Sequence, residues 1–169
     1  MLGAMLLLAR APVGCSGTTA EQHSSAADSL QGQGRFEEAI VRYGEAIDLS
    51  PKLAIAYLGR AAAYNTLGRF RQSQELLDQA IELDSNLPEA FNSRGLLALK
   101  TSQREKAIKE LDEAIRLDPR FGLAYANRAR VYTLTQQDDL AQWDFDRTVE
   151  YGLDPGSLEE DINGLKQIR

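Results

Sequence analysis

Residues 54–87 read AIAYLGRAAAYNTLGRFRQSQELLDQAIELDSNL, and the next 34 residues, 88–121, read PEAFNSRGLLALKTSQREKAIKELDEAIRLDPRF. The two segments align without a gap, so that aromatic residues and alanines recur at the same places. Ala80 coincides with Ala114, and the same spacing of 34 residues leads back to Ala46. A self-similar period of roughly 20–50 residues is typical of solenoids and other stacked repeats. The repeat therefore decides the fold class.

Four units of this length fit the chain, and we number them 1 to 4: 20–53, 54–87, 88–121 and 122–155. Each unit contains two apolar patterns at helical spacing. In unit 2, Tyr57, Ala61 and Tyr64 lie four and three residues apart and form one face of a helix. Gly68 interrupts this pattern before a second one begins. No alternation typical of strands is found, so we expect an all-α fold with two helices in each unit.

The pattern resembles the tetratricopeptide repeat (TPR) over residues 20–155. The matching residues are Tyr57, Ala61, Tyr64, Ser73 and Ala80 in unit 2, Phe91, Gly95, Ala107, Ala114 and Pro119 in unit 3, Tyr125, Ala129, Tyr132 and Ala141 in unit 4, and Phe36, Ala39, Tyr43, Ala46 and Pro51 in unit 1. Unit 1 departs from the pattern in its opening helix, where His23 and Leu30 replace aromatic residues. The resemblance implies a right-handed solenoid of four helix pairs, in which the first helix of each pair lines a concave groove.

Residues 156–169 follow the last unit, and we expect a C-terminal capping helix over 157–168. Ser157 and Glu160 have the spacing of a capping box at its start. The apolar residues form one stripe, namely Leu158, Ile162 and Leu165. A helix with a single apolar face can close the end of a solenoid and keep it soluble.

Residues 1–19 differ from the rest of the chain. The apolar run from Leu2 to Ala9 is shorter than the roughly 20 residues that a membrane span needs, but it has the size of a signal-peptide core. Cys15 follows it, as the acylated Cys does in bacterial lipoproteins, which this segment resembles. Arg10 and Pro12 depart from that motif. We predict lipidation of Cys15 and a membrane tether in the bacterial envelope; the alternative is a disordered extension on a cytoplasmic protein.

Composition excludes several classes of function. The 25 acidic residues outnumber the 19 basic ones and give a net charge of −6, which disfavours nucleic acid as a partner. A single Cys and a single His leave no disulfide framework, no Cys/His metal site and no His-based catalytic triad. No phosphate-binding or dinucleotide-binding glycine motif occurs either. We therefore expect no enzymatic activity, no cofactor and no metal.

Charged residues recur with the same period. Three arginines share the seventh position of their units and three aspartates share the twenty-fifth: Arg60, Arg94 and Arg128, and Asp78, Asp112 and Asp146. Unit 1 has Ala26 and Gly44 at these positions. The two positions lie at one level of an antiparallel helix pair, so we expect Arg–Asp pairs within each unit, with bidentate geometry available. The alternative is a row of arginines presented to an acidic ligand.

The family resemblance also implies which residues face a ligand in the groove: Ile55, Leu58, Ala62, Asn65, Asn92, Leu96, Leu99, Asn127 and Arg130. Apolar residues dominate this set, and its asparagines can both donate and accept hydrogen bonds to a peptide backbone. Ser24 and Asp28 stand where chaperone-binding TPR proteins have the Lys and Asn of a carboxylate clamp. We predict a non-enzymatic scaffold that binds a protein segment, as a peptide or a helix. The alternative is a cytosolic adaptor or a self-associating module without a lipid anchor.

Overall fold

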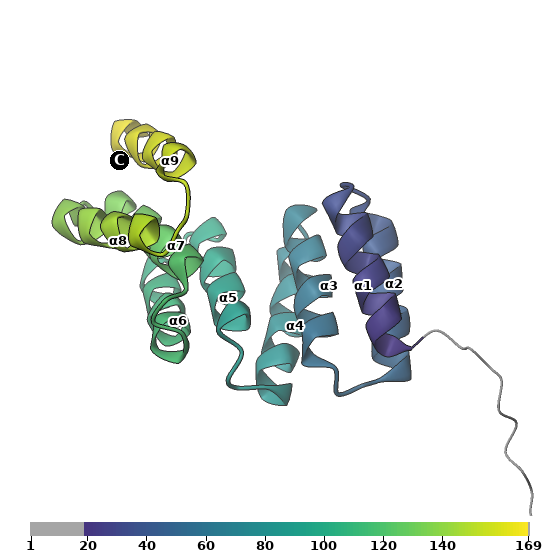
Figure 1. Cartoon of the computed structure of the whole chain (residues 1–169). Coiled ribbons are helices and arrows are strands. Elements are labelled where there is room, and N and C mark those ends of the chain that lie inside the picture. The colour runs from purple at the N-terminus through teal and green to yellow at the C-terminus, as the bar shows by residue number, and fades with distance from the viewer. Residues whose placement is uncertain (1–18, 169) are drawn as a thin grey trace, which may run out of the picture.

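The computed structural model describes residues 19–168, and Cys15 lies outside them. Within that range the chain forms nine α-helices and no strand (Figure 1). The helices are α1 (Ala20–Gly32), α2 (Phe36–Leu49), α3 (Ala54–Thr66), α4 (Phe70–Leu83), α5 (Pro88–Lys100), α6 (Arg104–Leu117), α7 (Gly122–Leu134), α8 (Asp138–Glu150) and α9 (Pro155–Ile168). The predicted all-α solenoid of four helix pairs with a final helix is confirmed.

Helices adjacent in sequence form antiparallel pairs, and the pairs stack in order along the solenoid (Figure 1). The backbones of the first helices of successive pairs, α1, α3, α5 and α7, also approach one another closely, whereas the backbones of successive second helices do not in the described part of the chain. A stack whose first helices lie closer together curves toward them. The first helices therefore line the concave face, and α2, α4, α6 and α8 form the outer face.

Small residues at fixed positions allow the paired helices to approach closely. A Cβ atom added to Gly95 on α5 would lie 2.8 Å from Cγ of Leu111 on α6. Ala61 and Ala129 occupy the corresponding places in units 2 and 4, and both are wholly buried. Large side chains such as that of Leu111 fill the space between these contacts, and burying one contributes about 1.5–3 kcal/mol. The periodic alanines and glycines thus determine the spacing of the helices.

The turn inside each unit needs one residue in the left-handed region of backbone conformation. Gly34 and Gly68 occupy this place in units 1 and 2, with φ of +76° and +72°. Units 3 and 4 have Ser102 and Gln136 there, with φ of 62° and 61°. A left-handed residue ends a helix and satisfies its last carbonyl groups, and glycine does so without a steric penalty. Units 3 and 4 therefore carry strain that units 1 and 2 avoid.

The final helix begins earlier than predicted. α9 starts at Pro155, so Ser157 lies inside the first helical turn and the predicted capping box with Glu160 is wrong. Proline suits a first helical position because its fixed φ is helical and its missing N–H would have no partner there. Leu158 and Ile162 of α9 are buried against α7. The final helix therefore caps the solenoid mainly by packing on α7, the first helix of unit 4.

The periodic arginines and aspartates pair between neighbouring units, so the prediction of pairs within one unit is wrong. We call this series of pairs the arginine–aspartate ladder. Arg94 of unit 3 binds Asp78 of unit 2, with 2.8 Å between Nη1 and Oδ1. Arg128 of unit 4 binds Asp112 of unit 3 at 2.6 Å in the same way. Asp146 instead accepts a hydrogen bond from Gln142 on its own helix. The sequence argument placed the arginine and the aspartate at the same level along their helices, and this is correct. It did not determine whether the arginine turns toward the second helix of its own unit or toward that of the preceding unit.

Each of these arginines has a second carboxylate from its own unit, two residues before the position that we predicted. Arg94 lies 2.8 Å from Glu110, and Arg128 lies 2.8 Å from Asp144. Asp144 is wholly buried, and this burial raises its pKa although the hydrogen bonds from Arg128 oppose the shift. Burial lowers the pKa of Arg128, but Asp144 and Asp112 outweigh it and raise that pKa above the ordinary value. The pair is therefore a buried link between α7 and α8.

Candidate functional site

The concave face contains two hollows, and five of the nine predicted groove residues line them. The first hollow lies between α3 and α5 and has a volume of about 140 Å³. Ala62, Asn65 and Leu96 line it, together with Lys100 at the end of α5. Lys100 donates a hydrogen bond to Oδ1 of Asn65 over 3.1 Å. This hollow is the smaller of the two, and its lining mixes small side chains, such as those of Ala61 and Ser73, with leucines.

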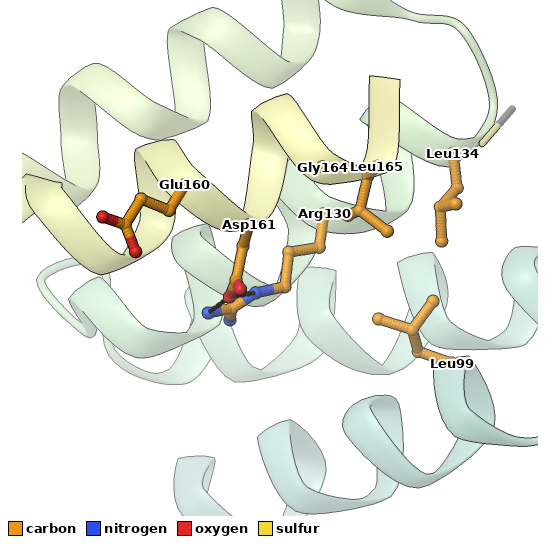
Figure 2. A pocket seen from close by; sticks show the side chains of 7 residues that line it. All are labelled: Leu99, Arg130, Leu134, Glu160, Asp161, Gly164 and Leu165. Atoms are coloured by element: carbon orange, nitrogen blue, oxygen red, sulfur yellow. Dashed lines mark hydrogen bonds and ion pairs between the residues drawn. The ribbon is translucent and has the colours of Figure 1, made fainter. Parts of the chain in front are cut away.

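The second hollow is larger, about 470 Å³, and is an open depression between α5, α7 and α9 (Figure 2). Leu99, Leu134 and Leu165 converge on it from these three helices. Arg130 and Asp161 lie along one side of the same space. An apolar space of this size with a few polar groups beside it is the usual form of a binding pocket.

The remaining predicted residues line neither hollow: Ile55, Leu58, Asn92 and Asn127. Ile55 is about half exposed at the start of α3, whereas Leu58 is buried. Asn127 donates a hydrogen bond to Oδ1 of Asn92 over 2.8 Å and accepts one from Arg130. Asn127 is itself buried, so most of its hydrogen-bonding capacity is used within the protein. The structure thus links the two asparagines across α5 and α7 rather than leaving both for a ligand.

Arg130 is held by an acidic residue of the capping helix. Its Nε and Nη2 atoms lie 3.0 and 2.7 Å from Oδ2 of Asp161, as the dashed lines in Figure 2 show. Half of the Asp161 side chain remains exposed. An ion pair exposed to that extent contributes about 0–1 kcal/mol. An acidic ligand could therefore compete with Asp161 for the arginine at small cost.

Sequence reasoning missed two contributions to the site. Lys100 directly follows Leu99, one of the residues that the family resemblance places in the groove. This neighbour was the signal that could have found it. The α9 residues Asp161, Gly164 and Leu165 had no such signal. The apolar stripe of α9 predicts that this helix packs on the last unit. It does not predict that α9 also contributes side chains to the groove.

Comparison with protein families identifies the repeats. The profile described as TPR repeat matches residues 28–68, and the profile described as Tetratricopeptide repeat matches residues 63–120 and 92–156. Together these matches span well over half of the chain. The chain belongs to the tetratricopeptide-repeat family. No curated protein matches this TPR chain in sequence.

Solved TPR structures share the fold. PilF of Pseudomonas aeruginosa is 20% identical, with a TM-score of 0.78 over 86% of this chain and 67% of that one. A thermophilic TPR protein of Thermus thermophilus is 18% identical, with a TM-score of 0.78 over 88% of this chain and 82% of that one. The first TPR domain of Spaghetti (RPAP3), bound to the HSP90 peptide SRMEEVD, is 22% identical, with a TM-score of 0.66 over 70% of this chain and 94% of that one.

Residues 19–168 contain neither a membrane-spanning helix nor a cluster of metal ligands. No helix in this range combines the length and the apolar character that crossing a membrane requires. The described side chains also include no group of three or more His, Cys, Asp or Glu residues that could hold a metal ion.

Proposed function

We propose that this TPR chain is a non-enzymatic protein-interaction scaffold that binds a peptide segment of a partner protein in the concave groove. Membership of the TPR family supports a scaffold for protein interactions. The observation that carries the proposal is the hollow of about 470 Å³ in which leucines from α5, α7 and α9 meet beside Arg130. Apolar side chains of the ligand would enter this hollow, and burial of their surface would supply about 25 cal/mol per Å².

Lys100 and Arg130 are the cations of the groove that would receive an acidic residue of the ligand, and Glu160 and Asp161 line the larger hollow beside Arg130. Lys100 is exposed at the end of α5, and Arg130 faces the larger hollow. In the RPAP3 complex, a TPR domain binds the peptide SRMEEVD, in which three of the last four residues are acidic. The present chain has no equivalent clamp in unit 1, so its acidic contact would lie at the other end of the groove. There the ligand would replace Asp161 at the guanidinium of Arg130.

Asn92 would fix the backbone of the ligand. Its Oδ1 accepts the hydrogen bond from Asn127, and its amide nitrogen makes no hydrogen bond to any described residue. Asn92 is partly exposed beside Leu96 on α5. An amide that still has donors can bind the carbonyl groups of a peptide whatever its side chains are.

Groove variants test the proposal. The full chain is immobilised, captured proteins are identified, and the binding segment of the captured partner is synthesised as a peptide. Leu96→Glu and Leu99→Glu should each weaken binding of that peptide at least tenfold. Val41→Glu is the matched control, because Val41 is 59% exposed on α2 of the outer face. Equal affinity for all three variants and the wild type would exclude the groove as the binding site.

The membrane tether through Cys15 and self-association stay predictions. Cys15 lies outside the described residues. A tethered scaffold and a soluble adaptor would use the same groove, so the groove variants test the binding site independently of the anchor.

A further inference from the structure

A second surface, on the outer face, contains a charged group that lacks its partner. α3 packs between α2 and α4, and Arg60 of α3 occupies the seventh position of unit 2. In units 3 and 4 the arginine at this position lies between two second helices and binds a carboxylate from each of them. We call these places furrows, and Arg60 marks the first furrow. No hydrogen bond or ion pair joins Arg60 to any other described residue.

The sequence explains why no carboxylate binds Arg60 in the first furrow. Gly44 of α2 occupies the position that Asp78 and Asp112 hold in the next two units. Leu76 of α4 occupies the position of the second carboxylate. A Cβ atom added to Gly44 would lie 3.7 Å from Cζ of Arg60, so the glycine leaves open the space that an aspartate fills in the other furrows.

One donor of Arg60 has lost its contact with solvent without gaining an acceptor. Its Nε atom is buried and makes no hydrogen bond. A buried donor without an acceptor is unfavourable, and more so when it belongs to a charged group. The contact that the guanidinium does make is with the ring of Tyr64, with 5.8 Å between Cζ and the ring centroid. The two Nη atoms are not buried and make no hydrogen bond to a described residue, so their parallel N–H donors can bind a planar carboxylate.

The furrow has room for such an anion. A hollow of about 200 Å³ lies beside Arg60 and Tyr64, with Glu75 and Leu76 of α4 on its other side. Glu75 is the acidic group of this hollow, and Arg71 one turn away binds it at 3.1 Å. The uncompensated charge at the furrow is therefore positive, although the whole chain carries −6.

We propose that the first furrow is a carboxylate-binding site on the outer face, and that its occupant is an aspartate or glutamate side chain of a partner protein. The two other furrows of the chain show the chemistry, because in both of them the arginine binds carboxylates of acidic side chains. The site is separate from the concave groove. It would allow the scaffold to contact a second partner, or a second part of one partner, on its opposite face.

The test follows the Nε–Hε signal of Arg60 by NMR in the ¹⁵N-labelled full chain, assigned with Arg60→Lys. The probes are the blocked peptide acetyl-Ala-Asp-Ala-amide, its asparagine counterpart, and sodium acetate. The aspartyl peptide and acetate should both shift the signal in a saturable way, and the asparaginyl peptide should bind at least tenfold more weakly. The signal of Arg71, whose side chain is 92% exposed, serves as the control for non-specific salt effects.

Gly44→Asp should abolish this response, because the new carboxylate would fill the furrow from inside the protein. Gly32→Asp adds the same charge in open space on α1 and should leave the response unchanged. Equal shifts at Arg60 and Arg71, or a response that persists in Gly44→Asp, would overturn the proposal. Binding of acetate without the aspartyl peptide would refute a partner side chain as the occupant.

Discussion

Gly44→Asp tests the cross-unit ladder through stability. The substitution gives unit 1 the carboxylate that Asp78 and Asp112 provide in units 2 and 3. Because the added Cβ would lie 3.7 Å from Cζ of Arg60, one further carbon brings the carboxylate oxygens within hydrogen-bonding reach. The expected geometry is that of Arg94 and Asp78, with 2.8 Å between nitrogen and oxygen.

The magnitude follows from two contributions. Replacing a glycine inside helix α2 by aspartate gains about 0.3 kcal/mol in helix propensity. A hydrogen bond to a charged group contributes about 1.5–3 kcal/mol when it is well shielded. The equivalent Asp78 side chain is 53% exposed, so we discount the new pair to about 0.5–1 kcal/mol. The sum is about 1 kcal/mol, or about 2–4 °C in Tm for a chain of this size.

Urea denaturation followed by circular dichroism at 222 nm measures this difference. Gly44→Asn is the matched control, since it has the same shape and similar helix propensity but no charge. A double-mutant cycle with Arg60→Gln isolates the pair, and salt should reduce its coupling energy. The reasoning fails if Gly44→Asp is no more stable than Gly44→Asn, or if its gain is unchanged in the Arg60→Gln background.

Three other predictions follow from the described contacts and from the sequence. Asp144→Ala leaves the guanidinium of Arg128 without its buried partner and should lower the free energy of unfolding by about 3–5 kcal/mol. The control Asp146→Ala should change it by less than about 0.5 kcal/mol, and equal losses in the two variants would contradict the ladder. Ser102→Gly relieves a left-handed residue with φ of 62° and should raise the free energy of unfolding by about 1 kcal/mol, and no gain would argue against strain in that turn. Cys15→Ala should move the protein from the membrane fraction to the soluble fraction of its native cells, and mass spectrometry that finds wild-type Cys15 unmodified would refute the lipid anchor.

The fold was predictable because the same pattern of residues recurs in four units, and each recurrence independently indicates the same helix pair. Each unit repeats the small residues where helices touch, such as Ala80 and Ala114, which are wholly buried. A chance match at one position cannot imitate a period that returns in four units. The resemblance therefore predicts the helix pairs and their stacking from the sequence alone.

Local signals were less reliable at the helix ends. Ser157 and Glu160 have capping-box spacing, but Pro155 starts the helix two residues earlier. The same four-residue pattern fits the cap of a helix and the inside of its first turn. A proline before such a pattern is therefore the stronger signal, because it fixes the first helical φ.

The partners within the ladder and the α9 residues of the larger hollow could not be predicted from the sequence, and the reason is geometric. Position numbers give the level of Arg94 along its helix, but the choice between Asp78 and Asp112 depends on the angle around that helix. The hollow beside Arg130 depends in the same way on the tilt of α9, which brings Asp161 and Leu165 to the groove. Tilt results from packing over the whole last unit, and no short motif encodes it.

Site-specific photo-crosslinking tests the central claim most directly. A photoreactive phenylalanine analogue is placed at position 99, in the larger hollow of the groove, and separately at position 140 on α8 of the outer face, away from the first furrow. With the partner identified by capture, the account predicts a crosslink from position 99 to an apolar segment of that partner, and none from position 140. Crosslinks from position 140 alone would show that the partner binds elsewhere and would contradict the groove as the binding site.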